Sequence, residues 1–247
     1  PAAIVRAVHD ETATSPISFR SDVTVELVRY SASDSDVLFA ARVSTQGEQT
    51  LESAQDAGVD ASRSRGRINY LMRDRHGSPF EHNAFRFHVR CPIFVAREWF
   101  RHRIGSFNEF SLRYAKATDD FYVPNAEDVR TQVGKPGAYR FESVSPELAE
   151  ETREEIAAVY EEAYAAYARL VEKGVARELA RSVLPVGAYT QFYWTVNARA
   201  LMNFVSLRNA EFAQVDIRRY AEAVEELFAS KMPVTHEALV ANERLAP

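Results

Sequence analysis

Apolar and polar residues alternate along three stretches of the chain, which predicts three strands. Residues 23–30 combine this alternation with a high content of β-branched side chains. In residues 83–90, Phe85, Phe87 and Val89 alternate with charged or polar neighbours, and residues 108–114 alternate in the same way. Because successive side chains of a strand point to opposite faces, each stretch would pack one face and present the other.

Apolar residues spaced three and four apart predict helices in much of the remaining chain. They indicate helices over residues 36–44, 68–75, 93–102, 175–184 and 215–230. A long acidic helix is expected to begin after Ser145, with Pro146 in its first turn, and to end at Gly174. Gly77 and Pro79 should interrupt the chain after residue 75, and the Gly- and Pro-containing residues 125–145 are expected to form a loop that could cover a site.

The helical spacing in residues 193–208 has a consequence for charge. It places Leu201 on the packing stripe, and Arg199 and Asn203 together on another face. Arg208 follows Leu201 by seven residues, so its side chain should leave the helix end from the apolar side. A charge there is costly unless another group pairs with it. The alternative is that Arg208 only complements the helix dipole.

The composition is that of a water-soluble globular protein. The chain has 247 residues, of which 46% are hydrophobic and 26% charged, and no apolar run approaches the roughly 20 residues of a membrane span. No secretory signal pattern opens the sequence, so a cytoplasmic location is expected. Cys91 is the only cysteine, which excludes an internal disulfide and predicts a small buried hydrophobic residue. No Pro/Gly/Ser-rich linker divides the chain, and we expect one domain.

Charge is distributed unevenly along the chain. The formal net charge is -5, yet residues 61–116 carry twelve Arg and Lys against four Asp and Glu. An acidic total disfavours nonspecific binding of nucleic acid, whereas a local basic region would attract a small phosphorylated ligand. Residues 101–114, RHRIGSFNEFSLRY, lie in this region. In an extended backbone their polar face would carry Glu109, Ser111 and Arg113, which suit phosphate oxygens and the edge of a base, and a solvated strand face is the alternative.

Other chemistries fit the residues less well. Four of the six histidines, His76, His82, His88 and His102, lie within 27 residues, but their spacing matches no zinc motif, so no metal site is expected. The sequence contains no GxGxxG or P-loop motif for a dinucleotide and no GxSxG elbow for a serine hydrolase. A nucleotide- or nucleic-acid-binding module without catalysis, which uses arginines and aromatic stacking platforms, is the second hypothesis.

Residues 101–114 resemble RHRxxSxNExSxRY, the signature of the flavin-dependent thymidylate synthases. The resemblance extends to GSPFEH at residues 77–82, ARSVLP at 180–185 and FYWTVNARALMNFVSLR at 192–208, and so covers nearly the whole chain. It implies an α/β (α+β) fold in which a single domain, residues 1–247, holds a central, mostly antiparallel sheet flanked by long helices. It also implies a homotetramer with shared active sites and no nucleic-acid or membrane partner.

The resemblance further implies reductive methylation of dUMP to dTMP, with 5,10-methylenetetrahydrofolate as carbon donor, NADPH as reductant and FAD as hydride carrier. Arg208 is similar to the arginine proposed to stabilise the ionised base and so activate its C5 carbon. Positions that match the dUMP contacts are Glu98, Trp99, Phe100, Arg101, Glu109, Phe110, Ser111, Leu112, Arg113, Arg181 and Arg208. Positions that match the FAD contacts are Ser78, Arg101, His102, Arg103, Asn108, Glu109, Asn197, Arg199 and Asn203.

Two positions need separate interpretation. Ser111 is expected to bind the nucleotide rather than attack it, because no base lies at a spacing that would activate its hydroxyl. Phe212 stands where the family usually has a histidine. An aromatic ring can stack but cannot donate a hydrogen bond through its side chain, so the folate and NADPH contacts in this corner are not predicted.

Overall fold

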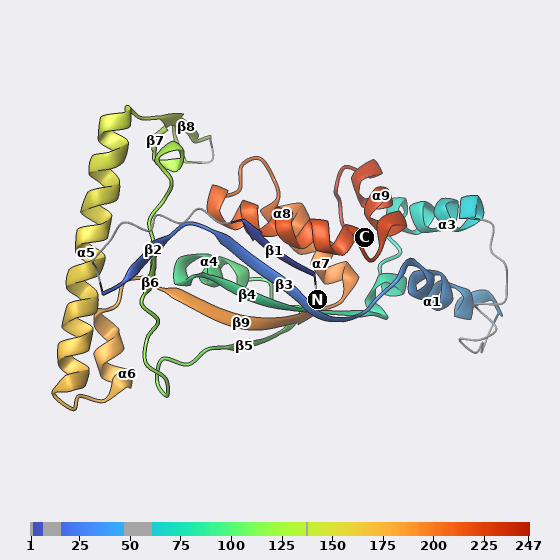
Figure 1. The fold of residues 1–247 in the computed structure, drawn as a ribbon. Coiled ribbons are helices and arrows are strands. Elements are labelled where there is room, and N and C mark those ends of the chain that lie inside the picture. The colour runs from blue at the N-terminus through green and yellow to red at the C-terminus, as the bar shows by residue number, and fades with distance from the viewer. Residues whose placement is uncertain (1, 7–15, 47–60, 137) are drawn as a thin grey trace.

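A five-stranded antiparallel sheet forms the centre of the molecule (Figure 1). The computed structural model describes residues 2–6, 16–46, 61–136 and 138–247. In spatial order the strands are β1 (Ala2–Arg6), β3 (Val23–Ser31), β4 (Ala84–Pro92), β9 (Tyr189–Val196) and β5 (Ser106–Glu109). Every neighbouring pair is antiparallel. The predicted class, helices around a mostly antiparallel sheet, is confirmed.

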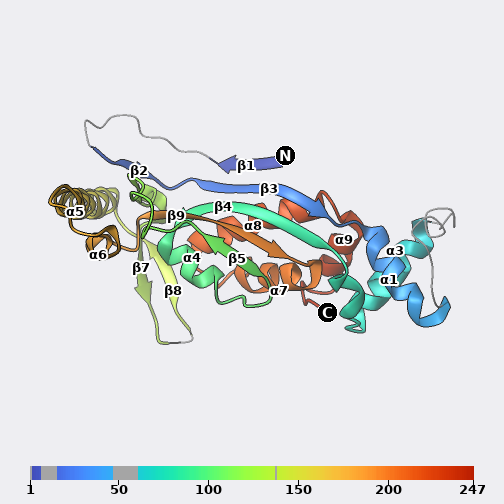
Figure 2. The same ribbon diagram turned by 90° about the horizontal axis from the view of Figure 1, so that it is seen from below.

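Helices bury one face of this sheet. They are α4 (Ile93–Trp99), α7 (Ala198–Arg208) and α8 (Val215–Ala229), and Figure 2 shows them behind the strands. Phe87 of β4 pairs in register with Trp194 of β9, and their rings stack with centroids 5.6 Å apart. Burying such a side chain contributes about 1.5–3 kcal/mol, so the aromatic layer fixes α7 firmly against the central strands. That packing sets the position of Arg208 at the end of α7.

Four further elements gather at one end of the sheet. These are α1 (Asp34–Gln46), α3 (Ala61–Arg73), the short 3-10 helix η1 (Ser78–Glu81) and α9 (Pro233–Ala241). The Asp34 carboxylate accepts the main-chain N–H groups of Val234 at 3.0 Å and Thr235 at 2.8 Å. It therefore satisfies donors that the first turn of α9 leaves unpaired, and its charge complements the dipole of that helix.

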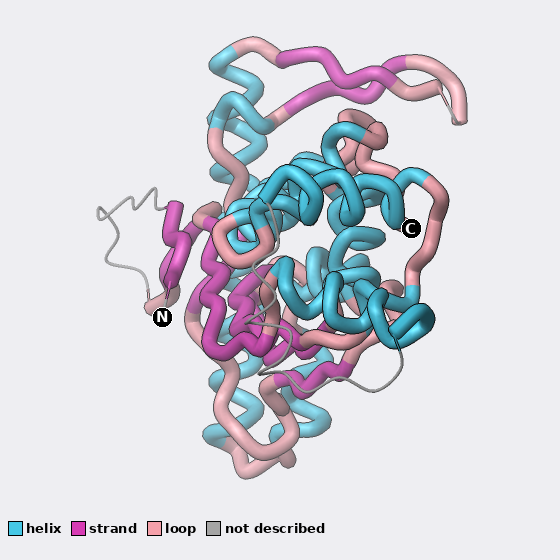
Figure 3. Tube along the Cα trace, turned by 90° about the vertical axis from the view of Figure 1, so that its right-hand side faces the viewer, coloured by secondary structure: helices cyan, strands magenta, loops and turns pink. Residues whose placement is uncertain are grey.

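The other end of the molecule is built around the longest helix. It contains β2 (Ser18–Arg20), β6 (Asp120–Tyr122), η2 (Ala126–Asp128), β7 (Arg130–Val133), β8 (Arg140–Ser143), α5 (Pro146–Glu172), α6 (Arg177–Ala180) and η3 (Arg181–Val183). Phe121, Tyr164 and Tyr167 lie in a second, smaller apolar cluster here. The β7–β8 hairpin extends away from the central body (Figure 3).

Most predicted elements are confirmed. The strands at residues 23–30 and 83–90 are β3 and β4, and the helices at 36–44 and 215–230 are α1 and α8. The Ser145 hydroxyl caps α5 by accepting the Leu148 N–H at 3.3 Å, and Gly174 follows that helix with a φ of 81°. Cys91 is completely buried, and burial raises the pKa of its thiol. Among the described helices, none combines the length and the apolar character needed to cross a bilayer.

Several predicted boundaries are wrong. The extended stretch at 108–114 stops at Glu109, because the Ser111 carbonyl accepts the N–H groups of Tyr114 and Ala115 and folds the chain into a turn. The helix at 93–102 ends at Trp99, where the His102 N–H bonds to the Trp99 carbonyl and tightens the last turn. The predicted helix at 68–75 is α3, which begins at Ala61.

Three more segments differ from the sequence prediction. The predicted loop at 125–145 contains the β7–β8 hairpin. Residues 193–196, which precede the α7 stripe, belong to the central strand β9, which the spacing did not predict. The helix expected over 175–184 is the short α6 followed by η3.

Candidate active site

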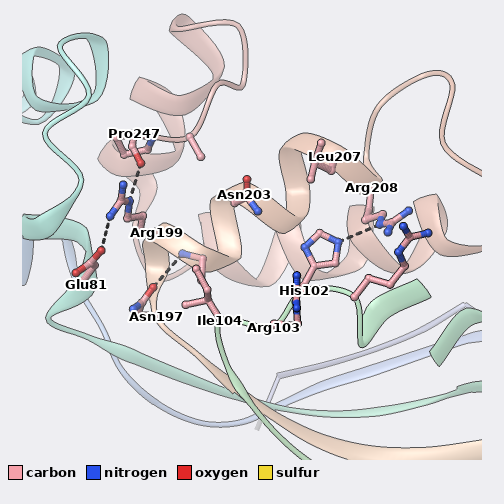
Figure 4. Close-up of a pocket in the computed structure, with 13 residues that line it drawn as sticks. Glu81, His102, Arg103, Ile104, Asn197, Arg199, Asn203, Leu207, Arg208 and Pro247 are labelled. Carbon is pink, nitrogen blue, oxygen red and sulfur yellow. Dashed lines mark hydrogen bonds and ion pairs between the residues drawn. The ribbon is translucent and has the colours of Figure 1, made fainter. Parts of the chain in front are cut away.

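A cavity of about 790 Å³ lies between the chain that follows α4 and one side of α7 (Figure 4). Its walls are formed by Glu81, Arg101, His102, Arg103, Ile104, Asn197, Arg199, Ala200, Asn203, Leu207, Arg208, Ala246 and Pro247. Four segments far apart in sequence therefore converge: η1 with Glu81, the start of the 101–114 motif, α7 with its N-cap, and the tail at 246–247. The volume is in the range of small-molecule sites.

The N-cap and the N-terminal half of α7 present three polar side chains to this cavity. Asn197 is the N-cap, and its Oδ1 accepts the Ala200 N–H at 2.9 Å. This bond leaves the Nδ2 amide of Asn197 as the group that can donate to a ligand. Arg199 and Asn203 follow on the exposed side of the helix, while Leu201 is buried, so the predicted division of faces is confirmed.

Arg199 is held in place from two sides. Its Nη1 lies 2.5 Å from Glu81 Oε1, and its Nε donates to a main-chain oxygen of Pro247 at 2.7 Å. Gly77 makes room for this guanidinium, because a Cβ at that position would clash with it. Gly77 has an ordinary φ of -74°, whereas Arg75 carries the left-handed φ of 57° in this turn. Gly77 is therefore required here for its lack of a side chain and not for its backbone freedom.

Arg208 leaves the end of α7 towards α4, with 19% of its side chain exposed. Its Nη1 lies 2.9 Å from Glu98 Oε2, and its Nη2 donates to the Glu98 carbonyl at 3.2 Å. Its Nε donates to His102 Nε2 at 3.0 Å. The prediction that another group pairs with this charge is confirmed. Because the pair is largely shielded from water, the guanidinium interacts more strongly with nearby charge than an exposed arginine would.

His102 is neutral in this arrangement. Its Nε2 accepts a hydrogen bond from Arg208, which requires the ring proton to be on Nδ1. Burial, and then the charges of Arg208 and Arg101, lower the pKa of His102 from 6.5 to about 4. The imidazole can therefore accept from Arg208 throughout the neutral pH range.

A second polar cluster, which we call the Glu178 cluster, comprises Ser111, Arg113, Glu178 and Arg181. Arg113 pairs with the Glu178 carboxylate at 3.1 Å, and Arg181 Nε donates to the Glu178 carbonyl at 3.3 Å. The Ser111 hydroxyl oxygen accepts the Arg113 N–H at 3.3 Å. Three residues predicted to contact the nucleotide therefore converge at Glu178 of α6, outside the cavity beside α7.

Three more predicted polar residues lie on η1 and β5. Ser78 opens η1, the element that carries Glu81. Asn108 and Glu109 end β5, and Glu109 Oε1 accepts the Thr190 hydroxyl at 2.7 Å. None of these predicted residues lines the cavity formed by the described part of the chain.

The predicted apolar contacts divide into packing residues and one core residue. Phe100 and Leu112 are partly buried against the two apolar clusters, and Phe110 donates its N–H to the Gln191 carbonyl at 2.9 Å. Trp99 is completely buried, and its ring stacks on Phe204 with centroids 4.6 Å apart. The structure thus places the Trp99 side chain in the core and not in the wall of the cavity.

Sequence reasoning did not identify six of the wall residues. They are Glu81, Ile104, Ala200, Leu207, Ala246 and Pro247. Glu81 lies within the GSPFEH run, so that run contained its signal. Ala200 and Leu207 share α7 with the predicted contacts. The tail residues carry no sequence signal, because only the folded chain brings Pro247 to Arg199.

The donors around the cavity suit a flavin dinucleotide. Arg101, Arg103, Arg199 and Arg208 offer guanidinium groups, which match phosphate oxygens, and Asn197 and Asn203 offer amides for the edge of a heteroaromatic ring. Glu81 carries the one carboxylate side chain among the described wall residues, and Arg199 pairs with it. In the described ranges no group of three or more His, Cys, Asp and Glu side chains is placed to hold a metal ion.

Comparison with known proteins relates this geometry to a family. Residues 26–234 match the family model Thy1, described as thymidylate synthase complementing protein. The chain is 51% identical over 239 residues to the flavin-dependent thymidylate synthase of Streptomyces coelicolor, an alignment that covers 94% of this chain and 96% of the relative. It is 44% identical over 236 residues to that of Tropheryma whipplei strain TW08/27, an alignment that covers 93% of this chain and 97% of the relative.

Solved structures are also similar to this chain. A crystal structure of the UMP/dUMP methylase PolB from Streptomyces cacaoi, bound with 5-Br dUMP, is similar with a TM-score of 0.86 and 48% identity, and the match covers 94% of this chain and 100% of that one. A second structure of that protein, bound with 5-Br UMP, gives a TM-score of 0.83 and 46% identity over 94% and 99% of the chains. On these matches, the chain belongs to the flavin-dependent thymidylate synthase family.

Proposed function

We propose that the protein catalyses the reductive methylation of dUMP to dTMP, with FAD, NADPH and 5,10-methylenetetrahydrofolate. The observation that carries this proposal is the convergence of residues 101–103 and the polar side of α7 on one cavity of about 790 Å³. When bound, FAD supplies hydride transfer between NADPH and the one-carbon unit. The polypeptide supplies binding, orientation and electrostatic stabilisation.

The cavity beside α7 holds the FAD. Arg101, Arg103 and Arg199 bind its phosphates, and the amides of Asn197 and Asn203 contact its polar edges. The remaining FAD contacts are assigned to Ser78, His102, Asn108 and Glu109 by resemblance. This arrangement replaces the glycine-rich phosphate loop that the sequence lacks.

Arg208 activates the nucleotide. Its guanidinium stabilises the negative charge that develops on the N3/O2 edge of uracil, which makes C5 more nucleophilic. Glu98 and His102 hold this guanidinium through three hydrogen bonds, so it is already oriented before the charge develops. Limited exposure of the side chain, 19%, reduces screening by water and strengthens this effect.

The Glu178 cluster binds the other end of dUMP, with Arg113 and Arg181 as phosphate contacts and Ser111 as a binding residue. In one chain this cluster lies at α6 and η3, beside α5, whereas α7 lies under α8 (Figure 1). A nucleotide that contacts both places is therefore bound between subunits. The protein acts as a homotetramer with shared sites.

Anaerobic turnover tests the reaction. Purified protein is incubated with dUMP, methylenetetrahydrofolate and NADPH, and dTMP is quantified while each component is omitted in turn. We expect dTMP only from the complete mixture and a yellow protein with flavin absorption. A colourless protein that forms no dTMP, and whose affinity for nucleic acid falls steeply with salt, would support the alternative of a binding module without catalysis.

UMP is a second candidate substrate. A specific observation favours it: the solved relative at 46–48% identity is described as a UMP/dUMP methylase and was crystallised with both 5-Br dUMP and 5-Br UMP. Parallel assays with dUMP and UMP under the same anaerobic conditions compare kcat/KM for the two. Equal values would extend the proposed substrate to both nucleotides, and activity with UMP alone would replace dUMP.

A further inference from the structure

A buried carboxylate on α8 joins three elements at the rim of the cofactor cavity. Glu225 is 5% exposed, yet its carboxylate accepts hydrogen bonds from Asn209 Nδ2 at 2.5 Å, from His236 Nε2 at 2.8 Å and from the Arg244 guanidinium. A buried charge is tolerated only when such partners satisfy it. Burial favours the protonated acid, but the bonds from Arg244, His236 and Asn209 outweigh it and lower the pKa of Glu225.

Two of these partners adjoin residues that line the cavity. Asn209 directly follows Arg208 and is the C-cap of α7. Arg244 lies two residues before Ala246, which is a wall residue. The Arg244 carbonyl also accepts the Ser206 hydroxyl, so Arg244 is bound to α8 through its side chain and to α7 through its main chain.

The tail conformation depends on these bonds. Glu243 and Arg244 both have a φ of 57°, a left-handed conformation that non-glycine residues rarely adopt and that persists only where the surroundings fix it. The Arg244 N–H also bonds to the Leu239 carbonyl at 2.9 Å. From this turn the chain reaches Pro247, whose main-chain oxygen accepts from Arg199.

We infer that Glu225 is a positioning residue for the cofactor cavity. Its carboxylate fixes two walls at once: the end of α7, which carries Arg208, and the tail 244–247, which holds Arg199. The inference rests on the proposed function, because it takes this cavity to be the FAD site. It assigns to Glu225 a role in ligand affinity beyond its contribution to folding.

The test compares two carboxylates whose side chains are shielded from water and paired with an arginine. In one pair the carboxylate, Glu225, lies on α8, and in the other the arginine, Arg219, lies on α8. Asp128 of η2 pairs with Arg219 of α8 at 2.6 Å, and the side chains of Asp128 and Glu225 are both 7% exposed. Asp128 does not line the FAD cavity. We expect Glu225→Gln to raise the Kd of FAD about tenfold, as loss of an outer-shell partner does at metal sites. Glu225→Gln and Asp128→Asn should lower Tm by similar amounts, but Asp128→Asn should leave the Kd of FAD unchanged.

Arg244→Gln provides a second variant at a more exposed position, where the side chain is 40% exposed, should Glu225→Gln fail to fold. It should weaken FAD binding in the same way. The double variant should bind FAD no more weakly than whichever single variant binds it more weakly, because both changes break the same Glu225–Arg244 ion pair. The inference is overturned if Glu225→Gln and Arg244→Gln lower Tm but bind FAD as tightly as Asp128→Asn. Wild-type protein that binds no FAD would instead refute the proposed function.

Discussion

Arg208 is charged and largely shielded from water, and its three hydrogen bonds go to two residues of the segment 98–102. Removing either Arg208 or Glu98 leaves the charge of the other shielded from water without its partner. Substitution of either residue is therefore costly. The Glu98 carboxylate stabilises the positive charge, and neutral His102 adds an acceptor without adding charge. At the scale of single residues, this small network is the part of the site on which the proposed chemistry depends.

Arg208→Ala is expected to retain bound FAD but to lower dTMP formation by about two to three orders of magnitude, the effect of removing a preorganised electrostatic group. The flavin absorption spectrum and anaerobic turnover report the two properties separately. Arg153→Ala is the control, because that arginine pairs with Glu150 on α5 and belongs neither to the cavity beside α7 nor to the Glu178 cluster. Unchanged turnover in Arg208→Ala would remove the role assigned to this residue.

The pKa of His102 can be measured by NMR titration, and we expect a value of about 4. Since the folded pKa is below the ordinary 6.5, the unfolded chain takes up a proton first as pH falls. The contribution of His102 to stability is therefore complete above about pH 6.5 and is lost progressively towards pH 4. Arg208→Ala should raise this pKa partway, because burial remains. A wild-type value at or above 6.5 would contradict the arrangement.

At the scale of elements, the junction between η1 and α7 shapes the cavity. η1 supplies Glu81, α7 supplies Arg199, and Gly77 leaves the space in which that guanidinium lies. Because the backbone of Gly77 has an ordinary helical φ, a methyl group there would disturb the arginine and not the turn. The contact between η1 and α7 and the shape of the cavity therefore both depend on the absence of a side chain at Gly77.

Gly77→Ala should therefore weaken FAD binding while changing Tm little, since the clash is with the movable end of Arg199. Gly66→Ala is the matched control: Gly66 lies in α3 with no atom within 4 Å of an added Cβ, so the substitution should stabilise the helix by up to about 1 kcal/mol. Calorimetry and FAD titration distinguish the two. FAD affinity equal to wild type in Gly77→Ala would show that Arg199 does not contact the cofactor.

Sequence patterns predicted elements well where one face is buried and the other solvated, as in α8 and β4. They failed where tertiary contacts decide. The helical spacing that continues into α7 assigns residues 193–196 of β9 to a helix, and only the pairing with β4 and β5 shows that they belong to a strand. The alternation at 108–114 continues beyond Glu109 in the sequence. The strand nevertheless ends at Glu109, because the Ser111 carbonyl accepts the N–H groups of Tyr114 and Ala115 and forms a turn.

At the scale of the whole molecule, ten of the predicted site residues form two groups. Seven of them line the cavity beside α7, and Ser111, Arg113 and Arg181 join Glu178 elsewhere. Local patterns and resemblance could indicate these residues. They could not indicate the separation of the two groups or the contribution of the tail, because both follow from how distant elements pack.

Subunit mixing tests whether the two groups act across an interface. Arg208→Ala and Arg181→Ala are each expected to be inactive as homo-oligomers. When the two variants are dissociated and reassembled together, some sites would combine an intact Arg208 from one chain with an intact Arg181 from another. We expect part of the activity to return. Mixed oligomers that remain inactive would indicate that each site is built within one chain.

The most direct measurement is a crystal structure with FAD and 5-Br dUMP bound. The account predicts that FAD lies against residues 101–103 and the polar side of α7, and that the uracil N3/O2 edge lies within hydrogen-bond distance of the Arg208 guanidinium. FAD bound away from this cavity, or a uracil ring beyond the reach of Arg208, would contradict it.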